Sequence, residues 1–334
     1  MIAVDGLAAV KATLSLCSPG SMGWPPWMDP CSIGNNLAAE LIWTAFVVGL
    51  ALSVSLYLLY GNRNARFRFF GLTRRHPSAC IFVSNVFVQS ASALEPVTNG
   101  YRGPAISQLE YEAAVQIQKK LTEKPIAVIL EPLQNLIDKH ICRYRDVEAE
   151  IRLSPRPPGD EVFTTDLLER SVASNLVDGA NIAIGSQIYN SVAKWYLEQY
   201  LRDPAEAYEE WFSITRNERN ERVIARVNSA GGNVELPRII GDGQDSIEPA
   251  FIMRMQHRER AVFLCAGITD WATAASVRYL VSQWKFLHKA MRDRDFGVAL
   301  AFRRSDVAGT CNLTMSEPFG LKPGRKSAGP QAVR

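Results

Sequence analysis

The hydrophobic pattern of the chain has one long apolar run near its start. Residues 41–62 include no formally charged residue, and twelve of the 24 residues in 37–60 are Leu, Ile, Val or Phe. A helix rising about 1.5 Å per residue spans roughly 36 Å over this length, and a bilayer has a hydrocarbon core about 30 Å thick. The run therefore predicts a transmembrane helix at residues 37–60. The alternative is a buried core helix, which rarely runs this long without a charge.

The charges that flank this run are distributed unequally. Residues 1–36 include one basic residue, Lys11, whereas the segment 61–77 that follows the run is rich in arginine: Arg63, Arg66, Arg68, Arg74 and Arg75. The positive-inside rule predicts that residues 1–36 lie outside and that the chain after residue 61 lies in the cytoplasm. These arginines either hold a juxtamembrane linker against anionic lipid or act only as a topology signal.

After residue 77 short apolar runs alternate with helical periodicities. Strands are predicted at 80–83, 125–130, 181–185, 261–265 and 295–302. Helices are predicted at 105–121, 133–141, 165–174, 190–201 and 270–288. This alternation is typical of an α/β fold, so we expect residues 78–310 to form a cytoplasmic Rossmann-like, doubly wound domain.

One part of this predicted domain lacks the alternation of strands and helices. Strand-like pieces separated by glycine turns occur at residues 209–214, 222–227, 233–240 and 250–255. They predict a β-rich insertion at about 205–258 that runs into the strand at 261–265. The tail, residues 311–334, is expected to be disordered because basic residues lie there among Pro and Gly.

Composition narrows the classes of function. The net charge of +3, from 37 basic and 34 acidic residues, is too small to predict nucleic-acid binding. Six cysteines in 334 residues exclude a disulfide scaffold. On the outer side, Cys17 and Cys31 form either a disulfide or two unpaired thiols. No CxxC pair or His/Cys cluster has metal-ligand spacing, so neither a metal nor a cofactor is expected.

The best candidate site lies where predicted strands pass through a turn into a helix. Such turns gather at the carboxyl edge of a parallel sheet, where the N-terminus of a helix favours an anion. The predicted ligand-binding residues are Ser84, Asn85, Gly185, Ser186, Gln187, Asn190, Gly267, Thr269, Asp270 and Thr273. The alternative is that these residues are helix caps and nothing more. Neither the phosphate-loop pattern nor GxGxxG is present.

Candidates for catalysis are weaker. Glu95 and Glu248 each precede a proline, and a carboxylate near a loop can act as a nucleophile or general base. Cys265 ends a predicted strand beside a helix start, where it is either an activated nucleophile or a buried structural thiol.

Together these patterns favour a single-pass membrane protein with a cytoplasmic ligand-sensing or binding domain. The expected ligand is a nucleotide-like or other anionic small molecule, and the lipid bilayer is the expected partner. One alternative is a membrane-anchored enzyme acting on a nucleotide or glycoside. Another is a structural protein that recruits a protein partner.

Overall fold

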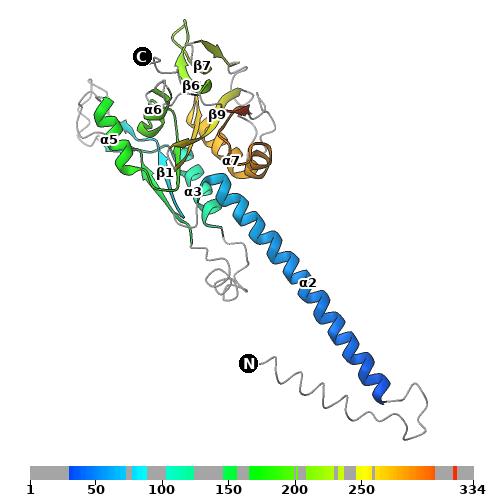
Figure 1. The fold of residues 1–334 in the computed structure, drawn as a ribbon. Coiled ribbons are helices and arrows are strands. Elements are labelled where there is room, and N and C mark those ends of the chain that lie inside the picture. The colour runs from blue at the N-terminus through cyan, green and yellow to red at the C-terminus, as the bar shows by residue number, and fades with distance from the viewer. Residues whose placement is uncertain are drawn as a thin grey trace, which may run out of the picture. The chain divides into compact units, whose positions relative to one another are not determined.

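The structure is a computed structural model. It describes residues 30–72, 77–88, 103–123, 146–155, 165–198, 201, 208–228, 232–236, 246–257, 260–304 and 319–321. The chain divides into two compact units, Met1–Gly61 and Asn62–Arg334. The second unit holds the sheets and the helices that cover them (Figure 1). Several predictions lie outside the described residues: the elements at 125–130 and 133–141, the side chains of Cys17 and Cys31, Glu95, Arg74 and Arg75.

The apolar run forms a single helix, α2 (Pro30–Phe70). Proline is favoured in the first turn of a helix because no backbone donor is lost there. The segment Ala39–Phe70 has a mean hydropathy of 2.1 over its most apolar part, none of which is buried. Among the described helices it is the one that is long and apolar enough to cross a membrane, judged by length and composition.

The end of α2 differs from the predicted juxtamembrane linker at 61–77. The helix continues to Phe70, where Gly71 adopts a φ of +72° and the amides of Gly71 and Leu72 bond back to Arg68 and Phe67, at 3.1 and 2.8 Å. This is a Schellman motif, which ends a helix at a glycine. Phe67, Phe69, Phe70 and Leu72 are buried in the core of the second unit. The last turns of the helix are therefore part of the domain, because their apolar side chains pack inside it.

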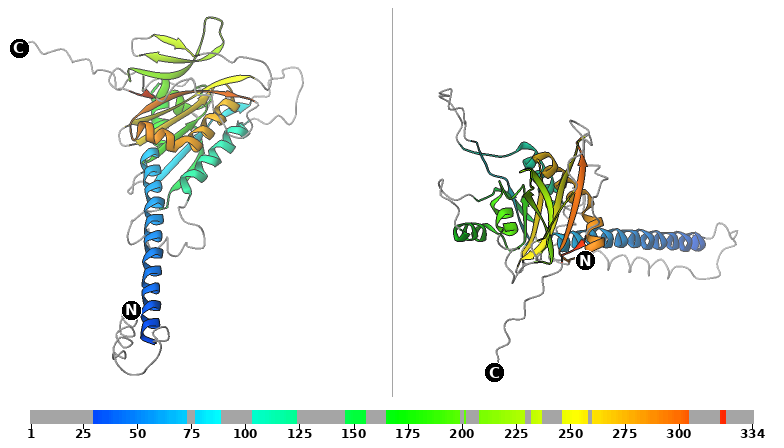
Figure 2. Two further views of the ribbon diagram at one scale, coloured as in Figure 1. Left: turned by 90° about the vertical axis from the view of Figure 1, so that its right-hand side faces the viewer. Right: turned by 90° about the horizontal axis from the view of Figure 1, so that it is seen from above.

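The centre of the second unit is a seven-stranded mixed sheet in the order β12-β11-β9-β10-β5-β1-β4 (Figure 2). Its strands are β1 (Ser78–Val83), β4 (Glu148–Leu153), β5 (Ala180–Ile184), β9 (Ile247–His257), β10 (Arg260–Gly267), β11 (Phe296–Arg303) and β12 (Phe319–Gly320). Neighbouring strands among β4, β1, β5 and β10 are parallel, whereas β9 is antiparallel to both of its neighbours. The α/β class is thus confirmed, with a mixed sheet.

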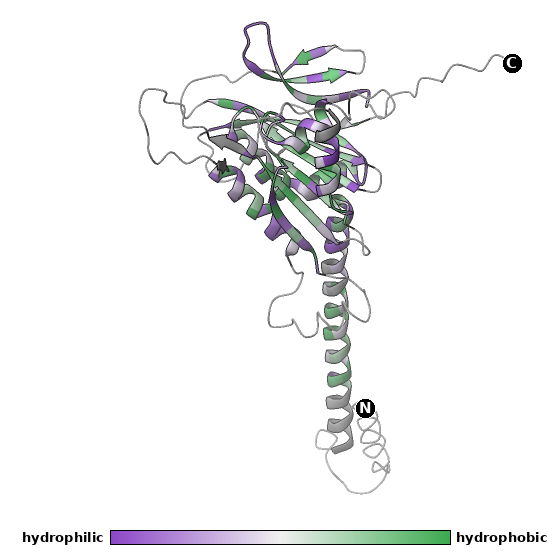
Figure 3. Ribbon diagram, turned by 90° about the vertical axis from the view of Figure 1, so that its left-hand side faces the viewer, coloured by the Kyte–Doolittle hydropathy of each residue, from purple (hydrophilic) through white to green (hydrophobic). Residues whose placement is uncertain are grey.

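Helices cover both faces of this sheet. On one face α3 (Gln108–Thr122), α7 (Asp270–Met291) and the end of α2 share a core with the sheet. On the other face lie α5 (Thr165–Asn175) and α6 (Ser191–Glu198). Strands buried on both faces are mainly apolar, and Figure 3 shows much of the central sheet in green. This two-sided burial explains why the predicted strands appear as unbroken apolar runs.

The predicted β-rich insertion is partly correct. A three-stranded antiparallel sheet contains β6 (Glu210–Arg216), β7 (Arg222–Asn228) and β8 (Asn233–Glu235). The fourth predicted piece is instead in β9, which lies in the central sheet between β10 and β11. Its residues are buried almost throughout, and such burial is possible only inside a covered sheet. A short ribbon of β2 (Val86–Val88) and β3 (Gly103–Ala105) completes the described strands.

Four described strands were not predicted: β2, β3, β4 and β12. In β4, polar and apolar residues alternate, which is the pattern of a half-exposed strand. In the predicted disordered tail, β12 pairs with β11, and the amide of Leu321 donates to Asp295 O at 3.0 Å. Leu321 is buried. Burial of one apolar side chain against the sheet edge thus orders this piece of the tail.

Candidate functional site

The carboxyl ends of the parallel strands meet at one edge, as the sequence predicts. Val83, Ile184 and Cys265 are aligned across β1, β5 and β10. The amide of Gly185, one residue beyond β5, donates to Cys265 O at 3.0 Å. From β1 the chain passes through α3 to β4, and then through α5 to β5 on the other side of β1. The strand order therefore reverses between β1 and β5, and α3 and α5 cover opposite faces.

A buried carboxyl group occupies this point of reversal. Glu110 in the first turn of α3 is 5% exposed, and its Oε2 accepts from the amide of Ser84 at 3.3 Å. The hydroxyl of Ser84 donates to Ile184 O at 3.3 Å. Gly185 has a φ of +119°, and a Cβ atom there would lie 1.9 Å from Ser84 Oγ and 3.3 Å from Glu110 Oε1. Only glycine fits, because both the backbone angle and the space exclude a side chain. We refer to Ser84, Glu110, Gly185 and Ser186 as the carboxyl-edge cluster.

The environment of Glu110 makes it a titratable group near neutrality. Burial raises the pKa of its carboxyl group from 4.5 to about 7, against the lowering effect of hydrogen bonds from Ser84. The negative charge of Asp270 raises the pKa further. Among the described residues, Glu110 has no basic partner in an ion pair. Such unpaired buried carboxyl groups are concentrated at functional sites.

Glu110 was missed by the sequence analysis, although a signal for it exists. Ser107-Gln108-Leu109-Glu110 has the form of a capping box, in which the serine and glutamate side chains would bond each other's backbone amides. Here Ser107 caps no amide, and its hydroxyl donates to Asp270 Oδ2 at 2.9 Å. Glu110 turns to Ser84 instead. The side chains of Ser107 and Glu110 thus both bond neighbouring elements of the carboxyl edge.

Two predicted ligand residues are used within the fold. The side-chain amide of Asn190 donates to Phe82 O and Ile184 O at 3.0 and 2.9 Å. Its Oδ1 accepts from the amides of Val192 and Ala193 at the start of α6. Gln187 bonds both the carbonyl and the amide of Ile214 on β6. These side chains hold strands and helices together, as the alternative interpretation of helix caps predicts for Asn190.

The turn after β10 is also structural. Thr269 accepts from the amide of Ala272 at 3.1 Å and caps α7, and its hydroxyl donates to Glu248. Thr273 accepts from the amide of Gly267 at 3.0 Å and donates to Thr269 O at 2.9 Å. At Gly267 a Cβ atom would lie 2.6 Å from Ala272 Cβ. Glu248 is buried, and its Oε1 lies 3.6 Å from Arg304 Nη1.

Other predicted ligand residues keep free polar atoms. Ser186 is 8% exposed, and its hydroxyl has no hydrogen-bond partner among the described residues. Asn85 donates to Ser154 O at 3.4 Å, whereas its Oδ1 is buried without a partner there. In the same turn as Ser186, Ile188 and Tyr189 are 47% and 41% exposed. The guanidinium of Arg222 lies 5.8 Å from the centre of the Tyr189 ring.

The remaining candidates are Cys265, the arginines of α2 and any metal ligands. Cys265 is fully buried, and burial raises the pKa of its thiol, which disfavours the reactive thiolate. Arg63 and Arg66 are 5% and 6% exposed, so the folded domain covers their side chains. Arg68 is exposed. No group of three potential metal ligands occurs within the described part of the chain.

These observations define a mixed α/β domain with a buried carboxyl group at the carboxyl edge of its parallel strands. No protein-family model, no curated protein and no solved structure matches this chain. The function must therefore be inferred from the residues of the site.

Proposed function

We propose that this chain is a single-pass membrane protein whose cytoplasmic, Rossmann-like domain binds a nucleotide-like small molecule at the carboxyl-edge cluster. The observation that carries the proposal is the position of Glu110, a buried carboxyl group without a basic partner among the described residues, at the reversal of strand order. In doubly wound sheets the carboxyl edge at such a reversal is where ligands bind.

The charges of this edge favour a hydroxyl-rich group over an anion beside Glu110. Asp270 lies in the first turn of α7 and Glu110 in that of α3, so each helix dipole is already offset by a carboxyl group of the chain. Carboxyl and serine hydroxyl groups suit the donors and acceptors of a ribose. We therefore place a sugar, rather than a phosphate, against Glu110, Ser84 and Ser186.

The exposed side chains of the same turn suit the rest of a nucleotide. The ring of Tyr189 offers a surface on which a base stacks, and one such contact contributes about 1–3 kcal/mol in nucleic-acid complexes. Arg222 beside this ring supplies a positive charge for a phosphate. Both groups lie outside the carboxyl-edge cluster, so base, phosphate and sugar have separate places.

Thermal unfolding of the full-length chain in detergent tests this proposal. A panel of nucleosides, nucleotides and sugar phosphates would be added to the wild type, to Glu110→Gln and to the matched control Glu112→Gln. Glu112 lies on the same helix but is exposed. A ligand at 100 times its dissociation constant stabilises by about 2.7 kcal/mol, which raises the midpoint by roughly 5–10 °C.

We expect the wild type and Glu112→Gln to show the full shift, and Glu110→Gln to lose most of it relative to its own ligand-free midpoint. A panel without any shift would contradict the proposal. An equal shift in all three proteins would place the ligand away from Glu110.

A second candidate function is an enzyme that acts on the same class of ligand. It is favoured by the pKa of Glu110 near 7, because a general acid or base works best when its pKa lies near the operating pH. Mass spectrometry of each stabilising compound distinguishes the two functions. A ligand recovered unchanged indicates a binding domain, and a product that disappears in Glu110→Gln indicates an enzyme.

A further inference from the structure

Strand β4 is the last strand of the central sheet among the described residues, and on its outer edge the carbonyl of Ala149 accepts from Gln118 Nε2 of α3 at 2.7 Å. Within the described part of the chain it pairs only with β1. The amides of Glu148 and Ser154 donate to Pro77 O and Val83 O, at 3.0 and 2.9 Å. Because alternate residues of a strand face opposite neighbours, the backbone groups of Ile151 and its second neighbours on either side point away from β1. No hydrogen bond to the backbone of Ile151 comes from the described residues outside this ladder.

The side chains along this edge carry opposite charges two residues apart. Glu150 and Arg152 lie on the same face of β4 and form an ion pair with an N–O distance of 2.5 Å. Their side chains are 61% and 37% exposed. Ala149 and Ile151 lie on the opposite face, where they pack against the core beneath α3. A partner strand would therefore meet one glutamate and one arginine, placed symmetrically about Ile151.

We propose that two copies of this chain pair through β4, antiparallel, about a two-fold axis at Ile151. In this register Ile151 faces Ile151 of the second copy, and the two residues exchange both of their backbone hydrogen bonds. Glu150 of each copy then faces Arg152 of the other, in the non-hydrogen-bonded pairs where side chains approach most closely. The two central sheets become one continuous sheet.

The charges also select this register over its neighbours. A slip that centres the axis on Glu150 places two glutamates opposite each other, and a slip that centres it on Arg152 places two arginines together. Like charges directly opposite destabilise a strand pair. A slip by one residue places the outward backbone groups of one β4 opposite residues of the other whose backbone groups already bond β1. Of these three registers, the one about Ile151 places no like charges directly opposite each other.

Charge reversal tests the pairing with the full-length chain in detergent. Sedimentation equilibrium would give the dissociation constant of the dimer, corrected for bound detergent, for wild type, Glu150→Arg, Arg152→Glu and an equimolar mixture of the two variants. Each single variant places like charges opposite each other at two symmetric positions, so we expect its dissociation constant to rise about tenfold or more. In the mixture, one variant supplies two positive and the other two negative residues, and a heterodimer of wild-type affinity is expected.

Two controls make the result specific. Glu112→Arg changes an exposed charge on α3 and should leave the wild-type dissociation constant unchanged. Circular dichroism of each variant establishes that it is folded, and recovery in the mixture excludes misfolding of the single variants. A monomeric wild type would overturn the proposal, as would a dimer that both charge reversals leave intact. Edge charges would then serve to prevent strand pairing.

Discussion

At the scale of single residues, the central feature is a glutamate whose helix-capping motif is used for another purpose. Ser107 and Glu110 occupy capping-box positions, but they bond Asp270 and Ser84 on other elements. Glu110 thereby becomes a buried carboxyl group whose pKa is about 7. A proton is held in the folded protein at a pH where an unfolded chain would release it, and this difference links stability to pH.

Replacement of Glu110 by Gln should therefore change the pH dependence of stability. Because the pKa is 4.5 before and about 7 after folding, the folded state binds the extra proton between these values. The free energy of unfolding of the wild type should fall as pH rises through this window, by on the order of 3 kcal/mol. Below pH 4.5 the group is protonated in both states and carries no such cost.

Unfolding by denaturant at several pH values, for wild type and Glu110→Gln, measures this dependence. The difference between the two proteins should grow in favour of Glu110→Gln as pH rises from 4.5 to 7, and then level off. Parallel pH profiles for the two proteins would show that Glu110 does not titrate in this window.

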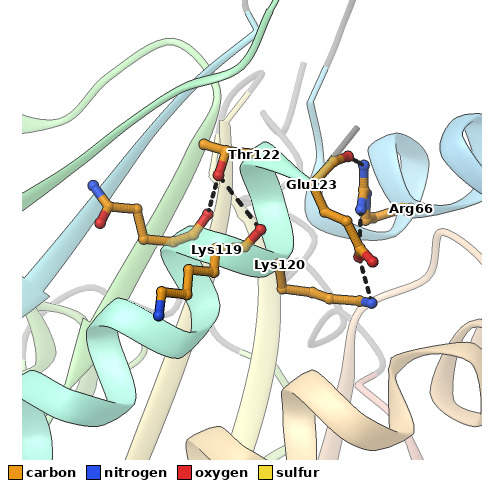
Figure 4. A network of polar contacts seen from close by, with 6 residues as sticks. Arg66, Lys119, Lys120, Thr122 and Glu123 are labelled. Atoms are coloured by element: carbon orange, nitrogen blue, oxygen red, sulfur yellow. Dashed lines mark hydrogen bonds and ion pairs between the residues drawn. The ribbon is translucent and has the colours of Figure 1, made fainter. Parts of the chain in front are cut away.

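At the scale of elements, side chains at helix ends join neighbouring elements. Asn190 joins the ends of β1 and β5 to the start of α6 through hydrogen bonds to both carbonyls and amides. Arg66 joins the ends of α2 and α3, with its guanidinium 3.1 Å from Glu123 Oε2 and 2.5 Å from Glu123 O (Figure 4). Lys120 adds a second ion pair to the same carboxylate.

Asn190→Ala should lower the free energy of unfolding by about 2–4 kcal/mol, because it removes a helix cap and two buried hydrogen bonds to the carbonyls of Phe82 and Ile184. The matched control is Asn175→Ala, whose side chain, among the described residues, bonds only within the last turn of α5; it should cost less than about 1 kcal/mol. Chemical denaturation compares the two. Equal losses would mean that the strand ends do not depend on Asn190.

Arg66→Ala should destabilise the domain by about 1–3 kcal/mol, since Arg66 is buried and bonds a backbone carbonyl. Arg68→Ala, two residues on and exposed, should change stability by less than about 0.5 kcal/mol. Thermal unfolding in detergent measures both. If Arg68→Ala were the more damaging change, the buried contacts of Arg66 would not be what joins α2 to α3.

At the scale of the whole molecule, helix α2 has an exposed apolar part and an end that is buried in the domain. The described apolar side chains from Leu41 to Val54 are exposed, whereas the last turns of α2 carry buried phenylalanines. Exposed apolar surface of this extent is costly in water and favourable in a bilayer. We therefore propose that α2 crosses the membrane with residues 1–36 outside, as the distribution of arginines predicts.

This topology predicts which cysteines react in intact cells. A membrane-impermeant maleimide should label Cys17 and Cys31, and a variant with both replaced by Ser should lose the label. If the two cysteines are bridged, labelling should require a membrane-impermeant reductant first. Labelling only after lysis would place residues 1–36 inside and contradict the proposed orientation.

The sequence by itself determined the local features of this protein. The apolar run of α2, the buried strands β1, β5 and β10, and the helices that follow them are each encoded by the periodicity of neighbouring residues. The meeting of Gly185 and Gly267 at one edge also followed, because parallel strands share their carboxyl edge. The Schellman glycine at Gly71 and the alternation in β4 were equally local signals, but they were missed.

Tertiary structure alone decided the composition of the site. The hydroxyl of Ser84 donates to the carbonyl of Ile184, one hundred residues away. The carboxyl group of Glu110 has a raised pKa only because it is buried beside the ends of β1 and β5. The same holds for Arg66. From the sequence, its charge predicted a contact with lipid, whereas in the structure it is buried and bonds Glu123 at the end of α3. Local patterns record whether a residue is apolar or polar. Which distant residue it meets, and how far burial shifts its pKa, depends on contacts that arise only when the chain is folded.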